Sequence, residues 1–246
     1  MDQLLIALDV PTGDQAARLA ASLRGVTGGL KIGSRLFTSE GPDIVRRLSA
    51  EGDRIFLDLK FHDIPNTVAD AVEAATTIGV WMVNVHASGG MRMMQAARNA
   101  AHDTAARLGR TPPLVIAVTV LTSMSGTALT ETGVAGTVLD QVLRLSEMTQ
   151  RAGLDGVVAS PQETATIRRH CGPDFAIVTP GIRGGVAKTS GKDDQERTMS
   201  PGEALGAGAS YLVVGRPIIA AADPRQAAEQ IVGDMRAPTS SWPSSR

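Results

Sequence analysis

Short apolar stretches of strand length alternate with longer stretches of helical periodicity along most of the chain. This alternation predicts a parallel sheet whose strands are joined by crossover helices. The strand-like runs cover residues 4–9, 29–32, 54–60, 80–86, 114–119, 156–159, 176–179 and 211–214. Helices are predicted near 13–24, 40–51, 65–78, 90–107, 137–152, 161–170, 201–207 and 224–235.

Eight strand-helix units within a chain of 246 residues favour a closed (β/α)8 barrel, the TIM barrel. An open, doubly wound α/β sheet is the alternative, although such sheets more often have fewer strands. No linker or change of composition divides the chain, so we expect a single domain over residues 1–236. Residues 237–246 are rich in Pro and Ser, and we expect a disordered C-terminal tail there.

Composition limits the classes of partner and compartment. Hydrophobic residues make up 43% of the chain and aromatic residues 3%, so Ala, Val, Ile and Leu must build the core. A formal net charge of -1 creates no field that favours nucleic acid or an anionic membrane. The single cysteine, Cys171, cannot form an internal disulfide. With no export signal and no apolar run of membrane length, the sequence predicts a soluble, cytoplasmic protein.

Polar residues stand at the end of nearly every predicted strand. In a TIM barrel the chemistry occurs at the C-terminal ends of the strands and in the loops that follow them. Candidate functional residues are therefore sought at these ends, which carry Asp9, Lys31, Asp58, Lys60, Asn84, His86, Thr119, Thr122, Ser160, residues 179–183, Gly215 and Arg216.

The segment 56–67 carries the densest group of charges. Side chains repeat every two residues along a strand, so Asp58 and Lys60 are expected on the same side, in the barrel mouth. Asp63 follows where the strand gives way to a helix. Charges this close to an apolar core must pair, and they perturb one another's protonation. A purely structural ion-pair network and a magnesium site are the alternatives, and the central lysine disfavours the metal.

Two loops suggest how a ligand is held. Gly215 and Arg216 follow the eighth strand, where TIM barrels often bind phosphate. The loop over 180–199 is long and polar and contains Gly184, Gly185 and Gly191, which favours a lid or a disordered insertion. Ser160 is either a ligand contact or a helix N-cap before Pro161. His86 lacks partners at metal-ligand spacing, which favours a hydrogen-bonded core histidine.

The motif Asp58-x-Lys60-x-x-Asp63-Ile64-Pro65-x-Thr67 resembles the signature of the orotidine 5'-monophosphate decarboxylases. Further matches occur in the family's order and extend from about residue 4 to residue 220. They are Ile6-Ala-Leu-Asp9, Leu30-Lys31-Ile-Gly33, Val85-His86-Ala87, Val118-Thr-Val-Leu-Thr-Ser123, Thr179-Pro-Gly-Ile-Arg183 and Val214-Gly-Arg-Pro217.

The resemblance implies decarboxylation of orotidine 5'-monophosphate to uridine 5'-monophosphate without a cofactor or a metal ion. Lys60 would be the proton donor for the carbanion that the departing carbon dioxide leaves on the pyrimidine ring. Asp58 would lie near the departing carboxylate. Lys31 and Asp63 would extend the alternating charges and keep Lys60 protonated and oriented.

The resemblance also implies a set of substrate contacts and a homodimer. Asp9 and Lys31 would contact the ribose, while Thr122 and Ser160 would contact the base. Asp63, Ile64 and Thr67 would enter the active site of the neighbouring subunit. The remaining expected contacts, at the phosphate and in the lid, are Pro180, Arg183, Gln195, Gly215 and Arg216.

Two other functions remain open on sequence grounds. Related barrels such as 3-keto-L-gulonate 6-phosphate decarboxylase share an Asp-x-Lys-x-x-Asp element but use magnesium and a sugar phosphate. The Ile64-Pro65-x-Thr67 continuation and the Pro180-Gly-Ile-Arg183 loop favour the nucleotide enzyme. A non-catalytic nucleotide-binding barrel is the other alternative, because a fold does not determine a function. The intact Asp58, Lys60 and Asp63 set argues against it.

Overall fold

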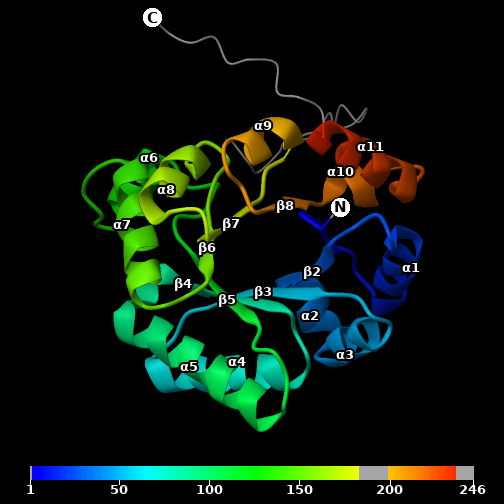
Figure 1. Ribbon diagram of the computed structural model, residues 1–246, viewed down its shortest axis with the longest axis horizontal. Helices are drawn as coiled ribbons and strands as arrows, with labels where there is room; N and C mark the ends of the chain where they lie inside the picture. The colour runs from blue at the N-terminus through cyan, green and yellow to red at the C-terminus, as the bar shows by residue number, and fades with distance from the viewer. Residues whose placement is uncertain (1, 183–198, 237–246) are drawn as a thin grey trace, which may run out of the picture.

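The computed structural model describes residues 2–182 and 199–236. Eight parallel strands follow one another in chain order and close into a barrel, with β8 pairing back onto β1 (Figure 1). The predicted barrel is therefore confirmed, and the open sheet is excluded. The strands are β1 (Leu4–Ala7), β2 (Gly29–Gly33), β3 (Ile55–Phe61), β4 (Met82–His86), β5 (Leu114–Val118), β6 (Gly156–Val158), β7 (Ala176–Thr179) and β8 (Tyr211–Val214).

The helices form a ring around the strands (Figure 1). No helix in residues 2–182 and 199–236 has both the length and the apolar content needed to cross a membrane. The helices that the periodicity predicted are α1 (Gly13–Leu23), α3 (Asp43–Ala50), α4 (Pro65–Thr77), α5 (Met91–Arg107), α7 (Val138–Arg151), α8 (Thr164–Cys171), α9 (Pro201–Gly206) and α11 (Pro224–Arg236).

Within the described part of the chain, four short helical segments were not predicted from the sequence. They are too short to display several turns of apolar periodicity, which is the signal used to find helices. The helix expected over 40–51 begins later than predicted, because Gly41 adopts a φ of 67° and separates it from a preceding helix. The additional segments are α2 (Ser34–Glu40), η1 (Ala87–Gly89), α6 (Gly126–Glu131) and α10 (Arg216–Ile219).

The apolar core has two layers, one inside the barrel and one between the strands and the helices. Successive strand residues point alternately inward and outward, so each strand contributes to both layers. The outer layer joins all eight strands to the helical ring. The inner layer fills the barrel with Leu5, Ala7, Phe56, Met82, Ile116, Val178 and Val213.

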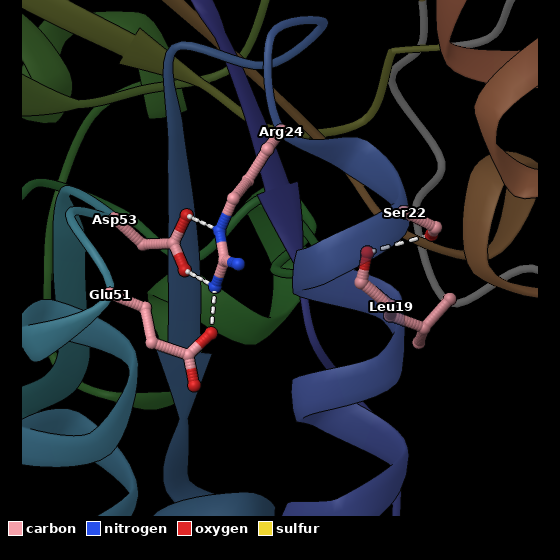
Figure 2. Close-up of polar contacts among 5 residues, drawn as sticks. All are labelled: Leu19, Ser22, Arg24, Glu51 and Asp53. Atoms are coloured by element: carbon pink, nitrogen blue, oxygen red, sulfur yellow. Dashed lines mark hydrogen bonds and ion pairs between the residues drawn. The ribbon is translucent and has the colours of Figure 1, made fainter.

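Ion pairs fasten the N-terminal face of the barrel, opposite the face where the chemistry is expected. The guanidinium of Arg24, just after α1, donates two hydrogen bonds to Asp53, of 3.3 Å from Nε and 2.9 Å from Nη2 (Figure 2). It also donates to Glu51, and these hydrogen bonds to Asp53 and Glu51 raise the pKa of Arg24. The turn before β2 is thereby tied to the turn before β3, on the face that serves stability in TIM barrels.

Candidate active site

The inward face of the barrel changes from apolar to polar toward the C-terminal ends of the strands. On β4 the inward positions run from Met82 in the inner core to Asn84 and His86 near the mouth. The same change follows Phe56 on β3, where Asp58 comes next on the inward face. The alternation of side chains along the strands therefore places these polar residues next to the inner apolar layer, on its C-terminal side.

Charges of opposite sign alternate across three neighbouring strand ends. Lys60 Nζ lies 2.7 Å from Asp58 Oδ1, and Lys31 Nζ lies 3.2 Å from Asp58 Oδ2. Lys31 Nζ also lies 3.6 Å from Asp9 Oδ1. The side chains of Asp58 and Lys31 are only 13% and 11% exposed. Four of the predicted site residues therefore form one partly buried array.

Asp58 is held in its ionised form at the centre of this array. Burial by itself would raise its pKa, because a low dielectric disfavours charge. The ammonium groups of Lys31 and Lys60, with hydrogen bonds from Lys60 and Asn84, outweigh that effect and lower the pKa of Asp58 below its ordinary value. A carboxylate at this position keeps two ammonium groups close together in the barrel mouth.

Strand β3 is irregular where it carries Lys60, whereas a regular strand was expected. Leu57 pairs with Val83 and Phe61 pairs with Val85, so three residues of β3 lie opposite Asn84 alone. Such a bulge frees backbone groups from the ladder. Lys60 has a φ of 54°, and it is the only non-glycine residue of the described chain with a positive φ.

Asn84 bonds to both charged residues of this bulge. Its Oδ1 accepts a 2.8 Å hydrogen bond from the backbone N–H of Lys60, and its Nδ2 donates a 2.7 Å bond to Asp58 Oδ1. The sequence marked Asn84 only as a polar residue at a strand end. Its role was missed because the bulge that brings it opposite Lys60 has no sequence signature.

Two histidines lie beside the array. The rings of His62 and His86 are 5.4 Å apart, and His86 is partly buried at the end of β4. Burial is the largest cause that lowers the pKa of His86, and the electrostatic effects of the nearby His62 and Lys60 lower it further. At neutral pH the imidazole of His86 is therefore uncharged.

Asp63, Ile64 and Thr67 lie on the surface of the single chain. All three are exposed, and Ile64 is 66% exposed, which is unusual for a large apolar side chain. Asp63 Oδ1 accepts a hydrogen bond from the backbone N–H of Ile64 at 2.6 Å, and within the described residues no ion pair joins Asp63 to Lys60. The single chain thus does not bring Asp63 to the lysine.

The two residues expected at the base lie after β5 and β6. Thr122 is half-buried in the loop after β5. Ser160 is completely buried, and its hydroxyl has no hydrogen-bond partner in the described structure. The N-cap interpretation of Ser160 is wrong, because α8 begins at Thr164 with Glu163 as its N-cap. Ser160 instead donates its backbone N–H to the Glu163 carboxylate at 2.9 Å.

The expected phosphate contacts lie after β7 and β8. Pro180 is partly buried after β7, while Gly215 and the exposed Arg216 lead from β8 into α10. Gly215 is close to the array, since a Cβ placed on it would lie 3.9 Å from Asp9 Oδ2. Arg183 and Gln195 fall outside the described residues.

The carboxylates of the array face ammonium groups and not one another. Residues 2–182 and 199–236 contain no group of three His, Cys, Asp or Glu side chains arranged to hold a metal ion. The array instead holds the ammonium groups of Lys31 and Lys60 on either side of the Asp58 carboxylate. Fixed ammonium groups in a partly buried site can stabilise negative charge that develops during a reaction.

The family model for orotidine 5'-phosphate decarboxylase / HUMPS proteins matches residues 2–231. The chain belongs to this family. The resemblance drawn from the motifs is therefore confirmed over nearly the full chain. The family contains the nucleotide decarboxylases that the motif at Asp58, Lys60 and Asp63 resembles.

Individual relatives of this family match with high coverage. The chain is 52% identical to the orotidine 5'-phosphate decarboxylase of Syntrophotalea carbinolica, covering 96% of this chain and 95% of the relative. It is 52% identical to the Chromobacterium violaceum protein of the same name, covering 94% and 91%. The crystal structure of orotidine 5'-phosphate decarboxylase from Lactobacillus acidophilus matches with a TM-score of 0.84 at 36% identity, covering 95% of this chain and 99% of that one.

Proposed function

We propose that this protein decarboxylates orotidine 5'-monophosphate to uridine 5'-monophosphate and that Lys60 supplies the proton. The observation that carries the proposal is the Lys31, Asp58 and Lys60 array at the barrel mouth, in a chain about half identical to enzymes of that name over their length. The bond between the ring carbon C6 and the carboxylate breaks, and its electron pair remains on C6. Carbon dioxide leaves, and the Lys60 ammonium delivers a proton to C6.

The array lowers the barrier by electrostatics. The ammonium of Lys60 is held by the 2.7 Å contact with Asp58 before substrate binds, so no solvent has to reorganise around the developing carbanion. Asp58 lies next to the departing carboxylate. Lys31 supplies a second positive charge, and Asp9 with Lys31 contacts the ribose hydroxyls. Proton transfer and charge stabilisation thus come from the same lysine.

The other contacts divide between the two ends of the nucleotide. Thr122 and the buried Ser160 contact the pyrimidine, and the Ser160 hydroxyl is supported in this role by its lack of a partner in the described structure. Gly215 and Arg216 contact the phosphate, for which a guanidinium is suited. Pro180, in the loop after β7, also contacts the substrate. Arg183 and Gln195, which belong to the expected set, complete the phosphate and base contacts.

The active form is a homodimer in which Asp63, Ile64 and Thr67 reach the neighbouring subunit's site. The support is that these residues are exposed in the single chain, with Ile64 presenting a large apolar side chain just before α4. A partner surface would cover it. Asp63 would then complete the alternating charges beside the partner's array.

The first experiment measures turnover of orotidine 5'-monophosphate in excess EDTA. We expect full activity in the wild-type protein. Lys60→Ala should abolish turnover yet retain measurable binding of uridine 5'-monophosphate, which has no carboxylate to lose. Inactivity of the wild type toward orotidine 5'-monophosphate both in EDTA and after magnesium is restored would favour the metal-dependent sugar-phosphate enzyme. Unchanged turnover of Lys60→Ala would reject the role of Lys60.

The shared site is tested by mixing inactive subunits. Hybrids of Lys60→Ala with Asp63→Asn contain one site in which both residues are intact, so partial activity should return. The matched control mixes Lys60→Ala with Asp58→Asn, whose defects always fall in different sites of the hybrid and leave neither site intact. No recovery in the first mixture, with subunit exchange verified, would contradict the shared site.

A further inference from the structure

We propose that Asn84 is a positioning residue whose carboxamide fixes both the backbone of Lys60 and the carboxylate of Asp58 in the catalytic geometry. The inference rests on the proposed function, because it assigns the residue that holds the proton donor in place. Asn84 itself does not touch the reacting atoms. It acts through the two charged residues to which it bonds.

The bulge in β3 creates the need for such a residue. Asp58, Leu59 and Lys60 lie opposite Asn84 alone, so the ladder with β4 cannot satisfy every backbone group of this segment. A buried N–H without a partner is strongly disfavoured. The backbone N–H of Lys60 finds its acceptor in Asn84 Oδ1 at 2.8 Å. The side chain of Asn84 thus replaces a missing partner of the strand ladder.

This bond also supports an unusual backbone conformation. Lys60 has a φ of 54°, a left-handed conformation that side chains other than glycine rarely adopt. Residues in such conformations persist only where the surrounding structure determines them. The direction of the Lys60 side chain follows from this conformation. The position of its ammonium group therefore depends on the hydrogen bond that Asn84 accepts from the Lys60 backbone N–H.

The second half of the amide orients Asp58. Asn84 Nδ2 donates to Asp58 Oδ1 at 2.7 Å, and the same oxygen accepts from Lys60 Nζ at 2.7 Å. Only one orientation of the amide satisfies both neighbours, because the Lys60 N–H requires an acceptor and the carboxylate requires a donor. This hydrogen bond also contributes to the lowered pKa of Asp58. An amide supplies a donor and an acceptor on separate atoms, whereas an ionised carboxylate supplies acceptors alone.

The position of Asn84 is itself rigid. It is 1% exposed, and its Cα lies opposite Ile116 in the regular pairing between β4 and β5. That pairing continues without interruption from Met82 to His86, in contrast to the bulged pairing with β3. Asn84 is therefore held in place by the regular pairing of β4 with β5. Its side chain in turn bonds to the irregular segment of β3 that carries Lys60.

The test separates catalysis from binding in two variants. Asn84→Ala removes both bonds, and kcat for orotidine 5'-monophosphate should fall roughly 10- to 100-fold, as expected for lost hydrogen bonds to a charged group and a buried N–H. Asn84→Asp keeps an acceptor for Lys60 but places a second carboxylate against Asp58, so its kcat should fall further. In both variants the dissociation constant of uridine 5'-monophosphate should change less than threefold.

A matched control excludes a general loss of folded protein. Ser146→Ala removes the hydroxyl of another fully buried residue, which bonds to the carbonyl of Val142 in α7 on the outside of the barrel. Its kcat should equal that of the wild type after correction for stability. Equal losses of kcat and of product affinity in the Asn84 variants, or a kcat within threefold of wild type, would overturn the positioning role.

The outcome is distinguishable from failure of the proposed function. If the wild-type protein does not turn over orotidine 5'-monophosphate, or if Lys60→Ala is fully active, the proposed reaction fails regardless of Asn84. If the wild type is active and Lys60→Ala is not, the Asn84 variants alone decide the positioning role. A crystal structure of Asn84→Ala should then show Lys60 displaced, and an unchanged Lys60 backbone and ammonium would count against the inference.

Discussion

A methyl group placed at Gly33 should disturb the charged array without straining the backbone. Gly33 ends β2 with a φ of -96° and a ψ of -179°, an extended conformation open to any residue. A Cβ at this position would lie 3.1 Å from Lys31 Nζ and 3.3 Å from Asp9 Oδ1. The perturbation Gly33→Ala therefore acts on the ammonium and its carboxylate partner directly.

The size of the effect follows from how far Lys31 must move. An ordinary carbon contact is about 3.6 Å, so the ammonium has to withdraw by about 0.5 Å. If this lengthens its 3.2 Å contact with Asp58 by the same amount, the attraction weakens by about 0.7 kcal/mol at an effective dielectric constant of about 20. A free-energy change of this size corresponds to roughly a threefold loss of kcat/KM. The Asp9 contact adds less, because Asp9 is half-exposed.

We therefore expect kcat/KM for orotidine 5'-monophosphate to fall between about three- and tenfold in Gly33→Ala. The free energy of unfolding in urea should stay equal or rise slightly, because alanine lowers the entropy of the unfolded chain. The control is Gly233→Ala in α11, where a Cβ meets nothing within 4 Å. It should keep full activity. Wild-type kcat/KM in Gly33→Ala would refute the reasoning, since it would mean that the array tolerates displacement of Lys31.

Two further predictions concern stability. The folded protein lowers the pKa of His86, so the unfolded chain binds that proton first as pH falls below the ordinary value of about 6.5. In urea titrations, the free energy of unfolding of the wild type minus that of His86→Gln should therefore decline from pH 7.5 to pH 5. A difference that does not change with pH would contradict this prediction. Thr137 and Asp140 form a capping box at the start of α7. Thr137→Ala should lower the free energy of unfolding by about 1 kcal/mol with kcat unchanged, and no shift of the urea midpoint would count against the cap.

The fold followed from the sequence where apolar periodicity extends over enough residues to be recognised. All eight strands were predicted, and β7 and β8 have the predicted bounds. The segments that were missed, such as α2 and α10, are of seven and four residues and cannot display a repeating face. Gly41 followed by Pro42 was the available signal for a helix boundary there.

The site was predictable as a set of residue types but not as a geometry. Asp58 and Lys60 were expected together from the alternation of a regular strand, and they do meet. The strand is nevertheless bulged, and a bulge depends on pairing with β4, which lies more than twenty residues further along the chain. Local periodicity contains no information on that pairing. The buried hydroxyl of Ser160, which has no hydrogen-bond partner among the described residues, was likewise undetectable, because a Ser-Pro pair before a helix is typical of an N-cap.

The bulge explains why the array needs a residue from outside the motif. A regular β3 would pair through its own backbone with β4, and Lys60 would then take its direction from the strand alone. In the bulged strand, Lys60 has a left-handed φ, and its N–H bonds to a side chain of β4. The ammonium is therefore positioned by two strands and not by one. Because Asp58 is bonded by the same amide, displacement of Asn84 would move the cation and its counterion together. Substitutions in β4 that alter the placement of Asn84 should therefore change turnover even where they touch no charged residue.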